Sequence, residues 1–138
     1  MKIEEIVDGN LTIAIILRGD DWEKGLNFIT SDNDFQQAGT WFYDKGKKIE
    51  PHAHLQCERT VAKTQELIYV RRGRVKIDFY GQQQQFLRSL ELASNDLTVF
   101  LNGGHGFEIL EDNTMIFESK NGPYLGKDRD KKIIQTHE

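Results

Sequence analysis

Two histidines separated by one residue carry the clearest chemical signal in the sequence. His52 and His54 flank Ala53, and side chains two positions apart on a β-strand point to the same side. The two imidazoles can therefore converge on one metal ion, and imidazole suits zinc, iron, nickel, copper and manganese. Two surface histidines on an edge strand would give the same short pattern, so the pair alone leaves both interpretations open.

The segments around this pair have the composition of short β-strands. Twelve glycines and two prolines punctuate apolar segments that are rich in β-branched and aromatic residues, as is typical of strands. No window of the sequence shows a helical repeat. We therefore expect an all-β chain with antiparallel sheets in a sandwich or barrel. The expected strands cover residues 11–17, 26–30, 40–43, 47–54, 67–70, 75–80, 86–92, 97–101, 107–110 and 115–118.

A longer pattern of spacings surrounds the histidine pair. Gly46 lies six positions before His52, and Glu66 lies seven positions before Gly73. The sequence thus reads Gly-x5-His-x-His and then Glu-x6-Gly, followed later by NDLTVFLNGGHGF. In these blocks the chain resembles the cupin superfamily: GKKIEPHAH and ELIYVRRG are similar to its first motif, and NDLTVFLNGGHGF is similar to its second. The resemblance covers roughly residues 38–120.

The resemblance implies a fold and a set of metal ligands. The fold would be a double-stranded β-helix, or jelly-roll, barrel. It would form a single cupin domain over residues 1–138, with a core at about 38–120 and a surface tail at 126–138. The barrel would hold one divalent transition metal, which could be Zn, Ni, Mn or Fe. Carried over position by position, its ligands would be His52, His54, Glu66 and His105.

The carboxylate ligand has two candidates. The family usually has a much shorter gap than the eleven residues that separate His54 from Glu66. Glu58 fits the short gap, but Gln65 then stands where a glycine would be expected. Glu66 fits the glycine spacing and begins an apolar strand, which leaves residues 55–65 as an inserted loop. We therefore favour Glu66, and strand parity then places every second residue after it inside the barrel.

Two polar residues continue an apolar face near the end of the chain. Glu118 and Lys120 share one side of the segment MIFESK with Ile116, so their side chains would enter the mouth of the barrel as acid, base or substrate anchor. Two solvated charges at a strand end would give the same pattern. Trp41 and Tyr43 also share a face, which suits stacking on a sugar ring or packing in a core or dimer interface.

These residues suit several functions. The resemblance to cupins of bacterial surface-polysaccharide and sugar-nucleotide pathways implies an enzyme that acts on a small carbohydrate or related polar metabolite. It would be an isomerase or epimerase that uses the metal as a Lewis acid. One alternative is a non-haem iron dioxygenase, because histidines and one carboxylate can hold Fe(II) with open positions. Another is a non-catalytic sugar- or metal-binding module.

Composition narrows the class of partners. The net charge is −4 and the charges are interspersed, so no basic stripe is available for nucleic acid. No apolar run approaches the ~20 residues of a membrane span, and the first residues lack the apolar region of a secretion signal. The single cysteine, Cys57, leaves no intrachain disulfide, so these features together predict a cytoplasmic protein. The resemblance to cupins implies a small, sugar-like ligand. The apolar segment 11–17 would suit exchange across a homodimer.

Overall fold

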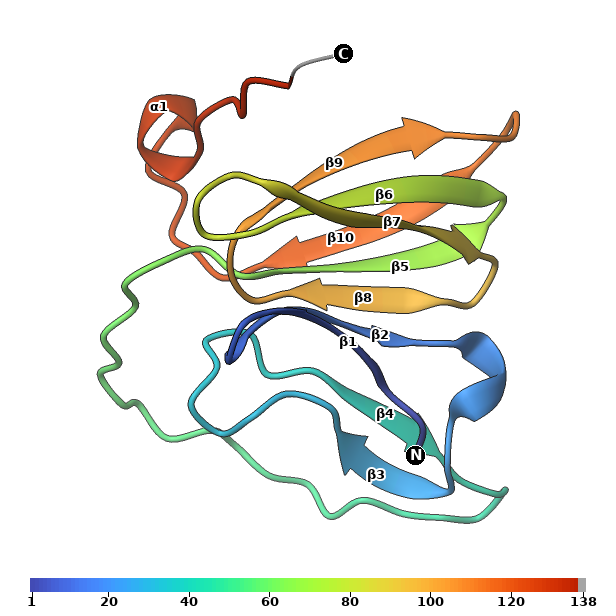
Figure 1. The fold of residues 1–138 in the computed structure, drawn as a ribbon. Helices are drawn as coiled ribbons and strands as arrows, with labels where there is room; N and C mark the ends of the chain where they lie inside the picture. Colours follow the sequence, from blue (N-terminus) through green and yellow to red (C-terminus); the bar gives the residue numbers. More distant parts are fainter. Residues whose placement is uncertain (137–138) are drawn as a thin grey trace.

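The computed structural model describes residues 1–136 and confirms the all-β prediction (Figure 1). Two short helical turns accompany the strands: a 3-10 turn at Gly19–Asp21 and α1 at Lys127–Asp130. The described residues form ten strands: β1 Glu4–Asp8, β2 Leu11–Leu17, β3 Gly25–Phe28, β4 Gly39–Phe42, β5 Glu66–Arg72, β6 Arg74–Tyr80, β7 Phe86–Ala93, β8 Leu97–Phe100, β9 Gly104–Ile109 and β10 Met115–Lys120. Residues 137 and 138 of the expected tail lie outside the described residues.

The strands form three antiparallel sheets. The largest has the order β1-β2-β8-β5-β10, a second has the order β7-β6-β9, and β3 and β4 form a hairpin. Figure 1 shows β6, β7 and β9 lying against one face of the five-stranded sheet. Among residues 1–136, no helix has the length and apolar composition that crossing a membrane requires.

The main core lies between the five-stranded sheet and the sheet of β6, β7 and β9. Val75, Ile77 and Phe79 alternate along β6 and are fully buried, as the period-two pattern of this segment predicts. They pack in one cluster with Ile68 and Val70 of β5. Burying one side chain of this size contributes about 1.5–3 kcal/mol, so this cluster holds the two sheets together.

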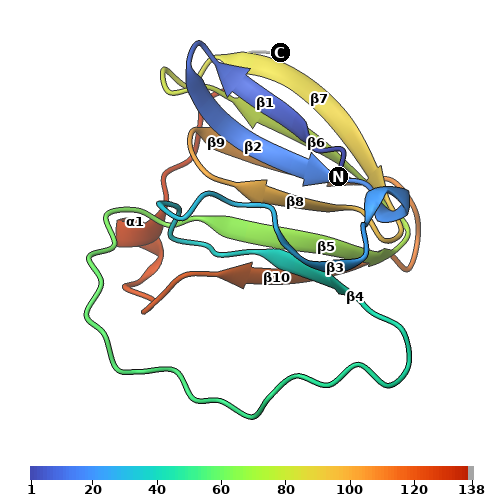
Figure 2. The same ribbon diagram turned by 90° about the horizontal axis from the view of Figure 1, so that it is seen from below.

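A second apolar cluster lies on the outer face of the five-stranded sheet. Leu17, Leu97 and Val99 contribute to it from β2 and β8, and Ala38 contributes from the residue before β4. The hairpin of β3 and β4 therefore lies on the far side of this sheet from β6 and β7, as Figures 1 and 2 show. The five-stranded sheet is the central layer of the molecule.

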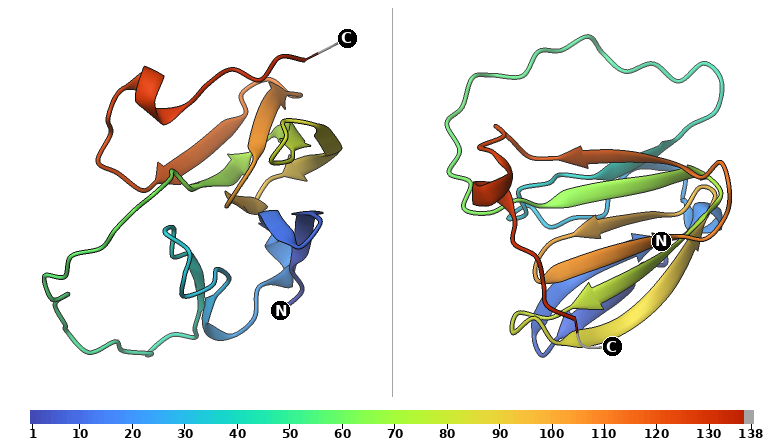
Figure 3. Two further views of the ribbon diagram at one scale, coloured as in Figure 1. Left: turned by 60° about the vertical axis from the view of Figure 1, so that its left-hand side comes forward. Right: turned by 90° about the horizontal axis from the view of Figure 1, so that it is seen from above.

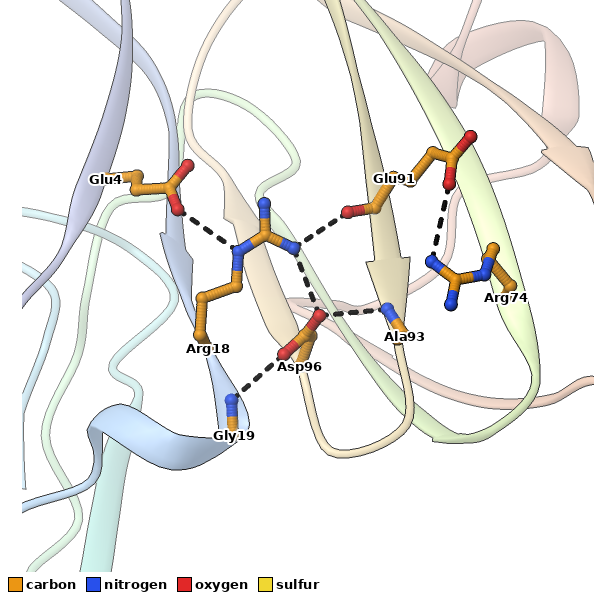
Figure 4. A network of polar contacts seen from close by, with 7 residues as sticks. All are labelled: Glu4, Arg18, Gly19, Arg74, Glu91, Ala93 and Asp96. Carbon is orange, nitrogen blue, oxygen red and sulfur yellow. Dashed lines mark hydrogen bonds and ion pairs between the residues drawn. The ribbon is translucent and has the colours of Figure 1, made fainter.

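A polar network fixes one end of the sandwich (Figure 4). Arg18, which follows β2, donates to the carboxylates of Glu4 and Asp96, each at 3.1 Å. Its guanidinium also donates to the backbone carbonyl of Glu91 in β7 at 2.7 Å. Asp96 accepts a further bond from the backbone N–H of Ala93 at 2.9 Å. Charge-assisted bonds of this kind are stronger than neutral ones, so the network ties β1, β2 and β7 to the turn before β8.

The strand predicted at residues 47–54 is wrong. Residues 43–65 contain no strand, and every residue from Trp41 to Thr64 is exposed. This segment extends away from the sheets as a wide loop (Figures 2 and 3). Pro51 supplies no backbone N–H to a ladder, and a strand needs a neighbouring edge to pair with, which this segment does not reach.

The closed barrel expected from the resemblance is not formed by residues 1–136. In a closed barrel every strand pairs with a neighbour on both sides. Here β9 pairs only with β6, and β10 pairs only with β5. On the opposite side β1 and β7 are edge strands as well, and side-chain contacts join the sheets there: Asp8 of β1 accepts a hydrogen bond from the backbone N–H of Gln82, in the turn after β6, at 3.0 Å. The two sheets therefore face each other across the core and are open on the side of β9 and β10.

Removing the Asp96 carboxylate should destabilise the fold. Asp96→Ala leaves the backbone N–H groups of Gly19 and Ala93 and the guanidinium of Arg18 without an acceptor that the structure provides. Unsatisfied groups of this kind cost about 1–3 kcal/mol each, so we expect the free energy of unfolding in urea to fall by at least 2 kcal/mol, roughly the cost of two of them. Asp112→Ala removes the same charge at an exposed turn and is the control. Equal stability of the two variants would contradict the role of the network.

Candidate active site

Four of the residues proposed from the sequence lie together at the open side of the sandwich. Glu66 is the first residue of β5, and Lys120 is its partner in the ladder with β10. Glu118 pairs with Ile68, which is buried in the main core, so Glu118 and Lys120 lie on the inner face of the sheet. His105, the second residue of β9, approaches Glu66 from the facing sheet.

The side chains of Glu66 and His105 meet between the two sheets. The Nε2 atom of His105 lies 3.2 Å from Oε2 of Glu66, and the two side chains are 25 % and 15 % exposed. The imidazole ring stacks on Phe100 with a centroid distance of 3.9 Å, and Phe107 lies edge-to-face to both rings, at 5.3 Å from His105 and 5.7 Å from Phe100. The ring is therefore fixed by two aromatic neighbours while one nitrogen meets the carboxylate.

A second carboxyl group shares a hydrogen bond with Glu66. Burial raises the pKa of Glu66, but the hydrogen bonds from His105 and Glu118 outweigh this effect, and the pKa of Glu66 lies below its ordinary value. The same hydrogen bond to Glu66, together with partial burial, raises the pKa of Glu118. Two adjacent carboxylates resist ionising together. When the pair carries a single proton, the hydrogen bond therefore favours the proton on Glu118 and the charge on Glu66.

Lys120 provides a fixed positive charge beside this pair. Its ammonium group lies 3.3 Å from a carboxylate oxygen of Asp130 in α1, and this hydrogen bond raises the pKa of Lys120. Asp130 also accepts a hydrogen bond from the hydroxyl of Thr64 at 2.7 Å, which together with Lys120 lowers the pKa of Asp130. Three segments of the chain thus hold Lys120 in its charged form near Glu66.

The carboxyl pair lies in a cleft that the C-terminal segment helps to enclose. The cleft has a volume of about 1120 Å³, and its wall combines polar groups with apolar side chains such as Phe107, Leu125 and Ile133. Ile134 packs against Gly104, where a side chain would collide with it. In the right-hand view of Figure 3 the segment after α1 crosses the strands at this end. The cleft is large enough for a small metabolite, and its mixed wall is typical of a binding site.

The remaining proposed ligands lie apart from this cleft. His52 and His54 are on the exposed loop of residues 43–65, with their ring centroids 5.4 Å apart. The Nδ1 atom of His52 lies 2.9 Å from the carbonyl oxygen of Glu50. Glu58, the alternative carboxylate, is exposed on the same loop. The structure thus divides the predicted ligands into two pairs.

The separation of His52 and His54 from Glu66 and His105 leaves too few ligands together to hold a metal ion. Within residues 1–136, no group of three or more His, Cys, Asp or Glu side chains is arranged to hold one. Glu66 and His105 supply two suitable donors, and a transition-metal site in a protein takes at least three. In this arrangement the residues do not fit a resident metal, so we assign no chemical step to one.

Several residues around the cleft were missed by sequence reasoning. Phe100 lies in the second motif but was given no role, Thr64 carries no motif, and Asp130 lies in a segment expected to be a surface tail. The pair Ile133 and Ile134 within that charged tail was the available signal, because adjacent β-branched apolar residues are uncommon in a solvated tail. Their contact with the cleft depends on distant parts of the chain and could not be read from local sequence.

The raised pKa of Glu118 predicts a pH-dependent effect of Glu118→Gln on stability. Because the pKa of Glu118 is raised in the folded state, its contribution is favourable below the ordinary carboxyl pKa of ~4.3 and is lost as pH rises through the folded-state value. Glutamine can still donate to Glu66 but carries no charge. We therefore expect Glu118→Gln to be more stable than the wild type at pH 7, by less than about 1 kcal/mol because the side chain is exposed, and equal to it near pH 3.

Urea unfolding at several pH values measures this difference. The control is Glu58→Gln, which removes the same charge from the exposed loop and should follow the wild type at every pH. A Glu118→Gln variant that is less stable than the wild type at pH 7 would show that the two carboxyls do not repel.

Comparisons with known proteins do not place this chain in a family. Protein-family models, curated protein sequences and solved structures were compared with it, and none of them matches. The functional argument therefore depends on the cleft itself: two hydrogen-bonded carboxyl groups with opposite pKa shifts, an oriented imidazole and a lysine at the open side of an antiparallel sandwich.

Proposed function

We propose that the cleft binds a small polar metabolite of the carbohydrate type and catalyses proton transfer, as in an isomerase or epimerase. The observation that carries this proposal is the pair of carboxyl groups whose pKa values shift in opposite directions, Glu66 downward and Glu118 upward. Such a divergence separates an acid from a base within one site. Perturbed carboxyl groups that share a cleft with a histidine and a lysine are candidates for function.

The proposed reaction uses Glu118 as the acid and Glu66 as the base. Glu118 donates its proton to the carbonyl oxygen of the ligand, while Glu66 removes a proton from the neighbouring carbon, which gives an enediol. Return of a proton to the other carbon and loss of the hydroxyl proton complete the isomerisation without net gain or loss of atoms. His105 holds the Glu66 carboxylate in place, and Lys120 supplies a positive charge for developing negative charge on oxygen.

We also propose that the sandwich is a jelly-roll of the cupin type that is open on one side. Two facing antiparallel sheets support this, as do the inward positions of Glu66 and His105 at one end of their strands. The predicted transition metal stays a proposal. It would require His52 and His54 to reach the pair of Glu66 and His105.

A hydrogen-exchange experiment tests the proposed chemistry. The purified protein is incubated in D₂O with a panel of aldoses, ketoses and sugar nucleotides, and NMR measures deuterium entering the carbon next to the carbonyl. We expect exchange on at least one compound and a loss of about 10²-fold or more in Glu66→Gln, because general acid–base groups contribute about 10²–10⁴-fold. Glu58→Gln is the control and should exchange at the wild-type rate.

Two outcomes would contradict the proposal. Ligand binding without any exchange, seen as chemical-shift changes alone, would identify a binding module. Exchange that persists in both Glu66→Gln and Glu118→Gln would show that the reaction does not use the carboxyl pair.

A further inference from the structure

Cationic side chains outnumber carboxyl groups in the cleft, although the chain as a whole is acidic. The chain has 22 acidic and 18 basic residues. Among the described residues that line the cleft, this order is reversed, with five cationic side chains and three carboxyl groups. The cations are Lys63, Lys120, Arg129, Lys131 and Lys132, and the carboxyl groups are those of Glu66, Glu118 and Asp130. An excess of one sign of charge in a cleft concentrates ligands of the opposite sign, so the cleft favours an anionic ligand.

The carboxylate of Asp130 shows how an anionic group is held in this cleft. One of its oxygens accepts a hydrogen bond from the hydroxyl of Thr64 at 2.7 Å, and the other lies 3.3 Å from the ammonium group of Lys120. Thr64 lies just before β5, and Lys120 is the last residue of β10. The two donors therefore come from segments far apart in the sequence, and together they bind both oxygens of one carboxylate.

The two donors are fixed by contacts that do not involve Asp130. The side chain of Asn121, the residue after β10, accepts a hydrogen bond from the backbone N–H of Gln65 at 2.7 Å. It also donates to the backbone carbonyl of Lys63 at 3.1 Å. Both neighbours of Thr64 are thus bonded to the residue that follows Lys120. Donors that are already in place cost little to order when an anion binds.

Asp130, in contrast, lies on a lightly packed segment. It ends α1, whose backbone hydrogen bonds join only residues 126–131, and α1 lies at the end of the sandwich where β10 ends (Figure 1). On either side of this turn, Leu125 is 59 % exposed and Ile133 is 74 % exposed. Segments with few buried apolar contacts open at a small cost in free energy. The carboxylate of Asp130 can therefore leave its two donors while the sandwich stays intact.

We propose that the cleft takes an anionic metabolite, and that Thr64 and Lys120 bind its phosphate or carboxylate group in the place that the Asp130 carboxylate holds in the free protein. We call Thr64 and Lys120 the anion subsite. That the ligand is a sugar rests on the function proposed above, but the anion subsite does not, because it follows from the contacts of Asp130. Lys63 and Lys131 also line the cleft and add positive charge around a bound anion.

The anion subsite lies beside the carboxyl pair. Lys120 pairs with Glu66 in the ladder, and Glu118 is two residues earlier on the same face of β10, which is about 7 Å along an antiparallel strand. A ligand with its anionic group at Lys120 therefore places its next carbons beside both carboxyl groups. An ammonium group has three donors, so Lys120 can hold the anionic group and still face developing charge on a neighbouring oxygen. The subsite thus orients the ligand for the proposed proton transfer.

Binding of matched sugars tests the anion subsite. Glucose, glucose 6-phosphate and glucuronate are titrated into nitrogen-15-labelled protein in a buffer free of phosphate and carboxylate, and NMR follows the backbone amides of Thr64 and Asn121. We expect both anionic sugars to shift these signals and to bind about tenfold more tightly than glucose, because hydrogen bonds to charged groups are the stronger ones. The tighter of the two identifies the anionic group as phosphate or carboxylate. Equal binding of all three sugars, or no shift at these amides, would overturn the subsite.

Replacing Asp130 tests whether its carboxylate occupies the place of the ligand. Asp130→Asn removes the competing charge, so the preferred anionic sugar should bind about threefold more tightly than to the wild type, in the range of an ion pair at a protein surface. Asp128→Asn removes the same charge from an exposed position of α1 outside the wall of the cleft, and it should bind like the wild type. An Asp130→Asn variant that binds no better than Asp128→Asn would show that Asp130 does not stand in for the ligand.

Replacing the two donors tests their part in binding. Lys120→Gln should weaken binding of the preferred anionic sugar by about tenfold, whereas Lys127→Gln, at an exposed position of α1, should bind like the wild type. Thr64→Val should also weaken binding, and Thr64→Ser, which keeps the hydroxyl, should retain it. Circular dichroism confirms that each variant is folded. Equal losses in Lys120→Gln and Lys127→Gln would mean that overall charge, and not the two donors, attracts the anion.

The outcomes separate the anion subsite from the proposed reaction. Anionic sugars that bind at Thr64 and Lys120 but exchange no proton in D₂O would contradict the isomerase and support the subsite. Proton exchange on sugars without any preference for an anionic group would overturn the subsite and leave the reaction of the carboxyl pair in place.

Discussion

The site depends on the alternation of side chains along β5. Ile68 and Val70 are buried in the main core, and this burial forces Glu66, two positions earlier, to face inward as well. A carboxylate in that position is costly unless it has a partner. Hydrogen bonds from His105 and Glu118 supply the partners. The packing of the core therefore creates the carboxyl pair, because it fixes which side of the strand the carboxylate occupies.

Local patterns predicted the parts of the structure that depend on local geometry. The alternation in β6 and the shared face of Ile116, Glu118 and Lys120 follow from the two-residue period of a strand, and both are present. The strand at 47–54 was wrong because a strand forms only against an edge, and the edge is not encoded in the segment. The bonds of Arg18 to Asp96 join residues 78 positions apart, and no sequence pattern indicated them.

The cleft combines rigid and exposed parts of the chain. Glu66 and His105 are held by paired strands and by the stacked ring of Phe100, which suits groups that must keep a fixed geometry. The loop of residues 43–65 and the segment around Asp130 lie at the surface and border the open side. In many enzymes a rigid scaffold positions catalytic groups while loops determine what enters. In this protein the sandwich is the rigid part, and the loop of residues 43–65 and the segment around Asp130 are the surface segments beside it.

The account depends most on the opposite shifts of the pKa values of Glu66 and Glu118. Carbon-13 NMR of the side-chain carboxyl groups, followed from pH 2 to pH 9, measures each pKa directly. We expect Glu118 to titrate above the ordinary value of ~4.3 and Glu66 below it, each perturbed by the other as coupled groups are. Two independent titrations near the ordinary value would contradict the acid–base pair and the function proposed for the cleft.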